Sequence, residues 1–373
     1  MIAQKINKWL KGVMAAAMTL AVATSCHDMW HQDYSDCPNG VYVKFKYDYN
    51  LQRADMFNDH VGQVTLYVFD ENGNYITQQT ETNSALSSPL KDPNYVMHVE
   101  NLQPGKYQFL ALAGQNAYAD QLASGRAKFV RTAPSATGDK MQKLEVNLDH
   151  ENRGEYDEVV NNSLPLDTLW HGKLLEAVEV SSSKPSYATI PLVRDTKKIN
   201  VALRDLDSPQ DMDVNDYTMT IEDHNARILW DNSLDESRKL IYTPHATWNT
   251  VDEDEQGKIA HADFMTSRIL KHEDYNQDGR LLIKNKETGN TVVNVDLPDL
   301  LSRLRTSEEY SYSAQEFLDR AYDYKLQFFI QGGQAQVLLH HHQRECAELE
   351  QAHPVRRTPL KLSNSNRIEN KKY

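Results

Sequence analysis

Residues 64–77 read Val-Thr-Leu-Tyr-Val-Phe-Asp-Glu-Asn-Gly-Asn-Tyr-Ile-Thr, two apolar runs separated by a polar turn. Asn72-Gly73 between such runs predicts a β-hairpin, because both residue types tolerate the positive φ of tight hairpin turns. We interpret the oxygen-bearing turn residues Asp70, Asn72 and Asn74 as turn formers and not as ligands of a cation. The stretch therefore predicts two antiparallel strands from which a sheet extends.

Strand-like segments continue on both sides of this hairpin. From Gly40 to Tyr49 apolar and polar residues alternate, and Gln103-Pro104-Gly105 is a turn before the alternating run Lys106 to Ala113. A period of two with β-branched and aromatic residues indicates half-buried strands. Further strands are expected at Tyr95–Val99, Leu144–Leu148, Leu169–Gly172, Ile190–Leu203, Tyr217–Ile221, Ala226–Trp230, Ile241–Thr243, Phe264–Leu270, Leu281–Asn285, Thr291–Val295 and Tyr322–Ile330.

The pattern predicts an all-β protein of two tandem β-sandwiches. A chain of 373 residues is too long for one compact core. The Ser-rich run that starts at Ser181 marks the best boundary, which gives an N-terminal sandwich over 37–183 and a C-terminal sandwich over 184–335. Short helices are expected only in the second, at Leu297–Arg305 and after the capping residue Ser313.

The N-terminus has the pattern of an export signal. Lys5, Lys8 and Lys11 precede an apolar run from Val13 to Val22, which is far shorter than the roughly 20 residues that span a bilayer. Residues 1–25 are therefore expected to be a signal peptide. It ends Ala-Thr-Ser before Cys26, which is similar to a bacterial lipobox, so Cys26 is the predicted lipidation site. The alternative is an ordinary signal peptide in which Cys26 is incidental.

A polar tether is expected over residues 26–36. It carries Asp28, Asp33 and Asp36 and resembles the acidic surface-export signal of Bacteroidales lipoproteins, although a solvated spacer is the alternative interpretation. Several acyl chains on Cys26 would hold the protein stably on a membrane, because a single chain binds only marginally. We therefore expect the protein to be attached to the outer membrane by the acyl chains on Cys26 and not by a membrane-spanning helix.

Charge and cysteine content narrow the range of partners. The formal net charge is -13, and a negative surface repels nucleic acid, so no nucleic-acid partner is expected. Besides Cys26, the chain has only Cys37 and Cys346. These suit a compartment that permits disulfides but do not form a disulfide framework.

Several motifs in order resemble the FimB-type fimbrial anchor lipoproteins of Bacteroidales. The resemblance implies two transthyretin-like sandwiches that are tethered to the outer membrane, hold a fimbria at its base and limit its length. It also implies that a fimbrial shaft subunit joins by strand addition, in which one chain fills a groove in its neighbour's sheet. The motifs are the lipobox at Cys26, Asp36-Cys37-Pro38, Leu66 to Gly73, Leu102 to Tyr107, Leu169 to Gly172, Pro191 to Ile199, and Tyr322-Asp323-Tyr324.

The family pattern breaks after Gln334. A polar tail with His340-His341-His342 stands where the family has a closing strand. Read one base later with permitted codons, the same nucleotides encode Ile-Thr-Ile-Asn, an alternating strand. We therefore interpret residues 336–373 as a frameshifted, disordered tail, with a designed tail as the alternative. Loss of the strand would leave an open sheet edge, and the shifted frame would supply a cysteine that could pair with Cys37.

No catalytic, metal or cofactor site is predicted, and the protein is not expected to be an enzyme. Neither a nucleophile elbow nor a phosphate-binding loop is present. The three consecutive histidines point in different directions and lack further ligands. Asp274 to Gly279 copies half of a calcium loop, but its twelfth position is Asn285 where a Glu is needed, so a hairpin turn is expected.

A surface glycan-binding lipoprotein is the alternative function. It would share the signal and the β modules but would need a line of solvent-facing aromatic residues. Candidates are Trp30, Trp170, Trp230 and Trp248, of which Trp170 and Trp230 lie in apolar runs and are expected in the core.

Overall fold

The hairpin predicted at residues 64–77 is present and forms one edge of the first sheet. Strand β2 (Gln63–Asp70) turns into β3 (Tyr75–Thr82). The Asp70 carboxylate accepts hydrogen bonds of 2.8 Å from the backbone N–H groups of Asn72 and Asn74. Only Gly73 in the turn takes a positive φ, 73°. The turn residues therefore bond to one another, as expected of turn formers.

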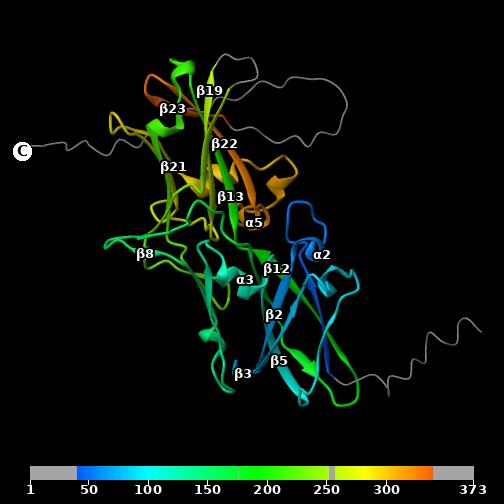
Figure 1. Cartoon of the computed structure of the whole chain (residues 1–373). Coiled ribbons are helices and arrows are strands. Elements are labelled where there is room, and N and C mark those ends of the chain that lie inside the picture. Colours follow the sequence, from blue (N-terminus) through cyan, green and yellow to red (C-terminus); the bar gives the residue numbers. More distant parts are fainter. Residues whose placement is uncertain (1–39, 175, 252–256, 339–373) are drawn as a thin grey trace, which may run out of the picture.

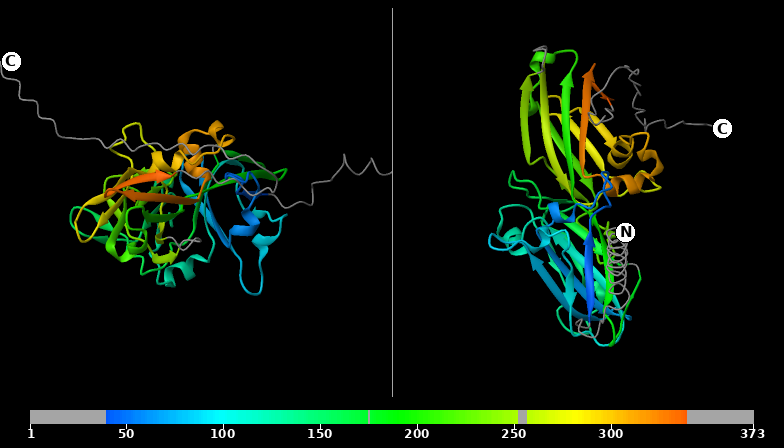
Figure 2. Two further views of the ribbon diagram at one scale, coloured as in Figure 1. Left: turned by 90° about the horizontal axis from the view of Figure 1, so that it is seen from above. Right: turned by 90° about the vertical axis from the view of Figure 1, so that its right-hand side faces the viewer.

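The computed structural model describes residues 40–174, 176–251 and 257–338. They form two β-sandwiches stacked end to end, with the N-terminal one below and the C-terminal one above in Figure 1. The side view in Figure 2 shows the two sandwiches meeting at a narrow waist. Their strands alternate between buried and exposed residues, as the period-two pattern predicts.

The first sandwich is one eight-stranded sheet that folds over its own core. Its strand order is β3-β2-β5-β10-β12-β1-β4, and β11 pairs with β5. Tyr47, Phe109 and Trp170 lie in its core with at most 1% of their surface exposed. The remaining strands are β1 (Val41–Lys46), β4 (Met97–Val99), β5 (Gly105–Gly114), β10 (Leu169–Lys173), β11 (Val178–Val180) and β12 (Ser186–Arg194).

The second sandwich consists of two sheets. One has the order β18-β19-β13-β22-β23 and the other β21-β20-β14-β17-β9-β8. The first comprises β18 (Ala246–Val251), β19 (Lys258–Thr266), β13 (Lys197–Asp205), β22 (Asp323–Gln331) and β23 (Gln334–Leu338). The second comprises β21 (Thr291–Asp296), β20 (Arg280–Asn285), β14 (Tyr217–Asp223), β17 (Leu240–Tyr242), β9 (Asp157–Glu158) and β8 (Glu151–Asn152).

A small four-stranded sheet links the two sandwiches. Its order is β16-β15-β7-β6, so strands from both halves of the chain share it. Phe129, Val146 and Ile228 from this sheet belong to the same continuous apolar cluster as the second core. The strands are β6 (Phe129–Thr132), β7 (Glu145–Leu148), β15 (Arg227–Leu229) and β16 (Leu234–Asp235).

Both short helices expected in the second sandwich are present. α4 (Leu297–Ser302) starts at Asp296, whose side chain accepts from the N–H of Asp299. α5 (Ala314–Arg320) starts at Ser313, as predicted, with a 3.0 Å bond from the Glu316 N–H. α4 ends at Ser302, short of the predicted end. No helix within the described residues is long and apolar enough to cross a membrane.

The first sandwich also contains helices, which the sequence did not predict. These are α2 (Phe57–His60) and α3 (Tyr118–Ala123). Single 3-10 turns lie at Pro89–Lys91, Met141–Lys143, Pro209–Asp211, Val214–Asp216 and Glu309–Ser311.

The expected boundary between residues 183 and 184 does not coincide with a change of sheet. β12 starts at Ser186 yet pairs in parallel with β1, so it completes the first sandwich. β8 and β9, from the expected N-terminal half, pair into the sheet of β17. The single strand expected over 190–203 is two strands, because the chain crosses between sandwiches at Asp195-Thr196.

The tail expected to begin at residue 336 starts inside a strand. β23 pairs with β22 from Gln331↔Gln334 to Gln327↔Leu338, so the closing strand begins before the pattern breaks. Within the described residues, no strand covers the outer edge of β22 from Asp323 to Leu326. The rest of the predicted tail, with Cys346 and the three histidines, lies outside the described residues.

Candidate functional site

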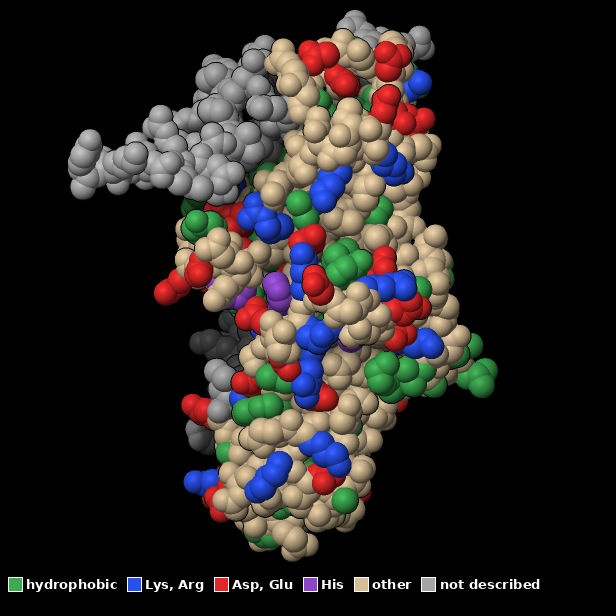
Figure 3. All heavy atoms as spheres, turned by 90° about the vertical axis from the view of Figure 1, so that its left-hand side faces the viewer, with side chains coloured by type: hydrophobic (Ala, Val, Ile, Leu, Met, Phe, Trp, Pro, Cys, Tyr) green, Lys and Arg blue, Asp and Glu red, His purple; other side chains and the backbone are tan. Residues whose placement is uncertain are grey.

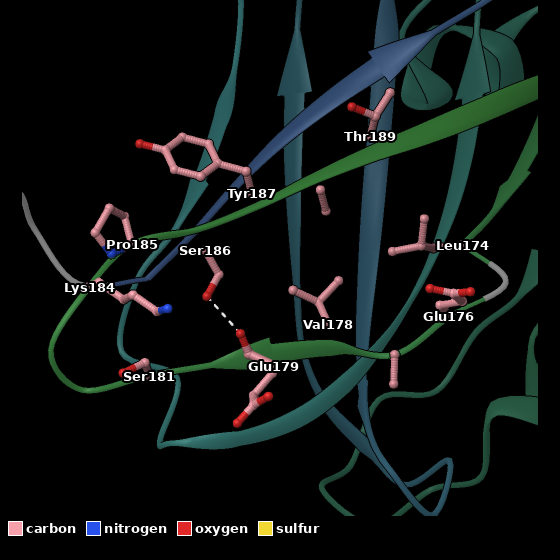
Figure 4. Close-up of a pocket in the computed structure, with 12 residues that line it drawn as sticks. Leu174, Glu176, Val178, Glu179, Ser181, Lys184, Pro185, Ser186, Tyr187 and Thr189 are labelled. Atoms are coloured by element: carbon pink, nitrogen blue, oxygen red, sulfur yellow. Dashed lines mark hydrogen bonds between the residues drawn. The ribbon is translucent and has the colours of Figure 1, made fainter. Parts of the chain in front are cut away.

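The first sandwich has an open cleft between β11 and β12. β12 follows β10 only from Leu192 to Arg194 and then diverges, while the chain leaves the sheet after β10 and returns as β11 beside β5. The resulting cavity of about 620 Å³ is lined from both strands and from the loops at both ends (Figure 4). We call this cavity the β11–β12 cleft.

The edge of β12 that faces the cleft carries unpaired backbone groups. The Ser186 N–H donates 2.9 Å to the Gly40 carbonyl, and the parallel register with β1 continues to Pro191. In a parallel ladder the backbone N–H and C=O groups of successive residues face opposite edges of the strand. Ser186 bonds to the β1 side, so the N–H and C=O groups of Tyr187 and Thr189 face the cleft. No partner for these groups occurs among the described residues. The cleft therefore presents a short open strand edge.

Both ends of the cleft are closed. At one end the Ser186 hydroxyl donates a 2.7 Å hydrogen bond to the Glu179 carbonyl of β11, the dashed line in Figure 4. At the other end Gly172 pairs with Leu192. A side chain at Gly172 would approach Leu192 to 2.6 Å, which explains why this crossing holds a glycine. The cleft is thus a local opening between strands that are held together at both of its ends.

The cleft has an apolar floor and a charged rim. Leu174, Val178 and Ala188 contribute aliphatic groups, and Ala188 is 9% exposed although it is small. Glu179 of β11 and Lys184 of the loop between β11 and β12 line the rim at the same end of the cleft (Figure 4). An alternating strand suits such a slot, because its apolar side chains can face the floor while its polar ones face water.

A row of stacked rings crosses the outer face of the same sheet and ends at the cleft. Tyr42 of β1 lies in register with His98 of β4 and with Tyr187 of β12. The Tyr42 and His98 ring centroids are 4.3 Å apart and nearly parallel, and those of Tyr42 and Tyr187 are 5.5 Å apart. Tyr187 is 69% exposed.

A buried lysine locks the crossing between the sandwiches. The Lys197 side chain has no exposed surface, and its ammonium group donates to the carbonyls of Arg194, Asp319 and Ala321 at 3.0–3.1 Å. Burial lowers the pKa of Lys197 to about 8, against the raising effect of Asp319 and Asp195. The crossing is therefore tied to the end of α5.

Arginine and aromatic side chains reinforce this joint. The Arg320 guanidinium lies 4.0 Å from the centre of the Tyr49 ring and 4.6 Å from that of Tyr312. Arg194 lies 4.0 Å from the Tyr322 ring. Tyr49 and Arg194 come from the first sandwich, and Arg320, Tyr312 and Tyr322 flank the second, so these cation–π contacts connect the two sandwiches.

Comparisons with known proteins place the chain in a family. Residues 34–340 match the model of the fimbrillin-A associated anchor proteins Mfa1 and Mfa2. This chain belongs to that family of fimbrial anchor proteins. The match confirms the resemblance based on the sequence motifs, and an anchor has a structural role at the cell surface. No match was found among curated proteins.

Solved structures similar to this anchor family member share its fold. A candidate adhesin from Bacteroides thetaiotaomicron is 27% identical over 82% of this chain and 97% of its own, with a TM-score of 0.66. A candidate polysaccharide-binding protein from the same organism is 28% identical over 81% and 96%, with a TM-score of 0.64. The fimbrial anchor protein Mfa2 from Porphyromonas gingivalis is 15% identical over 81% and 96%, with a TM-score of 0.57.

The cysteine predictions fall outside the described residues. Cys26, the predicted lipidation site, and Cys37, the possible disulfide site, both precede residue 40. They remain predictions for this anchor. The tryptophans follow expectation in part: Trp170 is fully buried, Trp230 is half-buried beneath Lys173, and Trp248 is 38% exposed and stacks on His261.

The half calcium loop is a turn whose acidic residues are already bonded. The expected hairpin is wrong, because the strands on either side, β19 and β20, lie in different sheets. The N–H of Gln277 donates to the Asp274 carbonyl at 3.0 Å. The buried Asp278 carboxylate accepts from Lys271 and from His272. Within the described residues, no group of three or more His, Cys, Asp or Glu side chains is placed to hold a metal ion.

The surface of the anchor carries both signs of charge. Figure 3 shows Lys and Arg side chains interspersed with Asp and Glu over one face of both sandwiches. Among the residues drawn in colour, that face therefore has no continuous stripe of positive charge of the kind that binds a nucleic-acid backbone.

Sequence reasoning predicted a strand-exchange groove in general terms but did not locate the β11–β12 cleft. One signal was available: Pro191 has no N–H, and proline within a sheet is confined to edges and strand ends. The proline therefore marked β12 as having an incompletely paired edge. The strand across the cleft, β11, could not be recognised, because three residues are too few for a periodic pattern.

Proposed function

We propose that this protein is an outer-membrane lipoprotein that holds a surface fimbria at its base and limits its length. Family membership supports the anchor role, and the signal-like N-terminus ending at Cys26 supports attachment through acyl chains. An anchor that occupies the base of a fimbria ends the polymer at one end. The fimbrial shaft subunit is the proposed protein partner.

The proposed joint to the shaft is strand addition at the β11–β12 cleft. The observation that carries this proposal is the open edge of Tyr187 and Thr189 above a cavity of about 620 Å³. A strand from the shaft subunit would satisfy the backbone groups of this edge and place apolar side chains in the cavity. Main-chain hydrogen bonds then supply affinity, and the pockets for alternate side chains supply specificity.

A proline substitution tests the cleft. Thr189→Pro removes the N–H from the open edge, and we expect capture of the purified shaft subunit to fall below detection in a pull-down. Thr189→Val is the matched control, because it keeps the N–H and the branched shape, and we expect it to capture the shaft like wild type. Equal capture by the two variants, both folded by circular dichroism, would exclude this edge as the joint.

A second substitution tests the anchor. Cys26→Ala removes the only thiol at the predicted cut, and we expect the protein to move from the membrane fraction to the soluble fraction. Retention of the variant in the membrane fraction would contradict lipid anchoring.

Glycan binding is the second candidate function. The ring row of His98, Tyr42 and Tyr187 is a short line of aromatic groups, and one similar structure is a candidate polysaccharide-binding protein. The test is titration with neutral oligosaccharides, in which saturable binding that Tyr187→Ser removes would favour this function.

A further inference from the structure

The ring row ends where a strand would be added. His98, Tyr42 and Tyr187 occupy matched positions on three neighbouring strands, and Tyr187 stands on the edge that opens into the cleft. A strand paired with that edge would run about 4.8 Å beyond β12. Its residue opposite Tyr187 would lie on the same outer face, at the next position of the row. The exposed ring of Tyr187 is therefore placed to pair with a side chain on the added strand.

The matching row of side chains on the inner face of the sheet leaves space at its end. On the inner face Met97, Val43 and Ala188 are in register across β4, β1 and β12. Met97 and Val43 are almost fully buried, whereas the row shrinks to a methyl group at Ala188, which lines the cavity. A large apolar side chain on the added strand would fill the space that Ala188 leaves.

We propose that the β11–β12 cleft selects a strand in which an aromatic residue opposite Tyr187 is directly followed or preceded by a large apolar residue beside Ala188. The inference rests on the proposed function, since it names the chemistry of the strand that the cleft accepts. Aromatic pairs across strands stabilise a sheet beyond the area they bury. Adjacent residues of a strand face opposite sides of the sheet. One dipeptide would therefore contact Tyr187 on the outer face and Ala188 on the inner face.

Synthetic peptides test the selection. Ten-residue peptides of alternating Thr and Val carry a central Tyr-Leu, Ser-Leu or Tyr-Ala pair, and their affinity for the intact chain in detergent is measured by calorimetry. We expect Tyr-Leu to bind about 3- to 10-fold tighter than Ser-Leu, the range that aromatic pairs supply, and tighter than Tyr-Ala. Thr189→Pro should abolish binding of all three peptides.

Variants separate the possible outcomes. Tyr187→Ser should erase the preference for Tyr-Leu over Ser-Leu, while Tyr275→Ser, at a 62% exposed turn residue remote from the cleft, should keep it. Equal affinities for the three peptides, still blocked by Thr189→Pro, would overturn the selection and leave strand addition intact. No binding of any peptide, together with normal shaft capture by Thr189→Pro, would overturn both. Saturable oligosaccharide binding that Tyr187→Ser removes, without any peptide preference, would assign the ring row to glycans and overturn the inference.

Discussion

The Ser186 hydroxyl donates a 2.7 Å hydrogen bond to the backbone carbonyl of Glu179, and this bond closes one end of the β11–β12 cleft. It is the point at which the two strands that border the cleft are joined directly. In the proposed strand addition, a strand that enters the cleft along β12 would have to displace this bond. If strand addition occurs as proposed, the bond stabilises the free anchor and opposes assembly.

Removing this bond should favour strand addition. We expect Ser186→Ala to bind the shaft subunit about 2- to 10-fold tighter, since a net hydrogen bond of about 0.5–1.5 kcal/mol no longer has to be replaced. Ser181→Ala is the control, because Ser181 lines the same cleft but bonds only within its own turn. Biolayer interferometry measures the affinity of each variant for the shaft subunit. Weaker binding by Ser186→Ala would contradict the prediction and show that the bond holds the cleft in the conformation that binds.

Lys197 should be essential to the stability of the joint. Lys197→Met removes the ammonium donor from three carbonyls, of which that of Ala321 keeps only a long 3.4 Å bond from the Tyr324 hydroxyl. A buried carbonyl left without a donor costs about 1–3 kcal/mol, so the free energy of unfolding should fall by at least about 2 kcal/mol. Its neighbour Lys198 is 47% exposed and lies 3.9 Å from Asp323, so Lys198→Met should change it by less than about 1 kcal/mol. Urea unfolding measures both, and similar effects would contradict the locking role.

Asp223 should make stability depend on pH. Burial raises the pKa of Asp223 to about 7, whereas an unfolded aspartate titrates near about 3.9. Between these values the unfolded state has lost a proton that the folded state keeps, so the free energy of unfolding falls as pH rises from about 4 to about 7.

Asp223→Asn has no such proton to release. Its stability relative to wild type should therefore increase over the same pH range and level off above it. Asp274→Asn, in an exposed turn, serves as the control. Thermal unfolding at several pH values measures the difference, and a constant gap between wild type and Asp223→Asn would refute the assignment.

Arg320 should couple the two sandwiches. A double-mutant cycle of Arg320→Gln with Tyr49→Leu should give an interaction energy of about 0.5–2 kcal/mol, as expected of a cation over an aromatic face. The comparison cycle pairs Arg320→Gln with Glu316→Gln, whose 2.9 Å ion pair lies within α5 and should give about 0.3–0.5 kcal/mol. A Tyr49 coupling near zero would show that Arg320 does not couple the two sandwiches.

The closing strand should lengthen in the alternative reading frame. Continuing β23 with Ile-Thr-Ile-Asn in place of residues 340–343 would cover the outer edge of β22 near Asp323. Several added cross-strand pairs of roughly 0.2–1 kcal/mol each should raise the free energy of unfolding by about 1–3 kcal/mol.

Two measurements check the frame. Resequencing the gene across the codons for Gly332 to Arg344 shows whether the strand is in frame, and mass spectrometry of the restored protein without reductant shows whether Cys37 forms the proposed disulfide. Reads that keep the present frame, together with no gain in stability from the restored strand, would leave the tail as a genuine feature of the chain.

Local sequence determined most of the individual elements. The alternation in β1, the turn at Asp70 to Gly73 and the caps at Asp296 and Ser313 depend on residues close together in the chain, so their structure follows from propensity and spacing. The family could also be recognised, because the order of several weak motifs is itself specific. The short strands β8, β9 and β11 escaped prediction, since two or three residues carry no period.

Only the tertiary structure decided how these elements combine. The alternation of Ile199, Val201 and Leu203 places Lys197 on the inner face, but the three carbonyls that make its burial tolerable come from the end of β12 and from the end of α5. Likewise β12 has the pattern of an ordinary strand, and its open edge arises because β11 pairs with β5 and not with β12. Pairing between distant segments is set by packing over the whole domain, which no local pattern encodes.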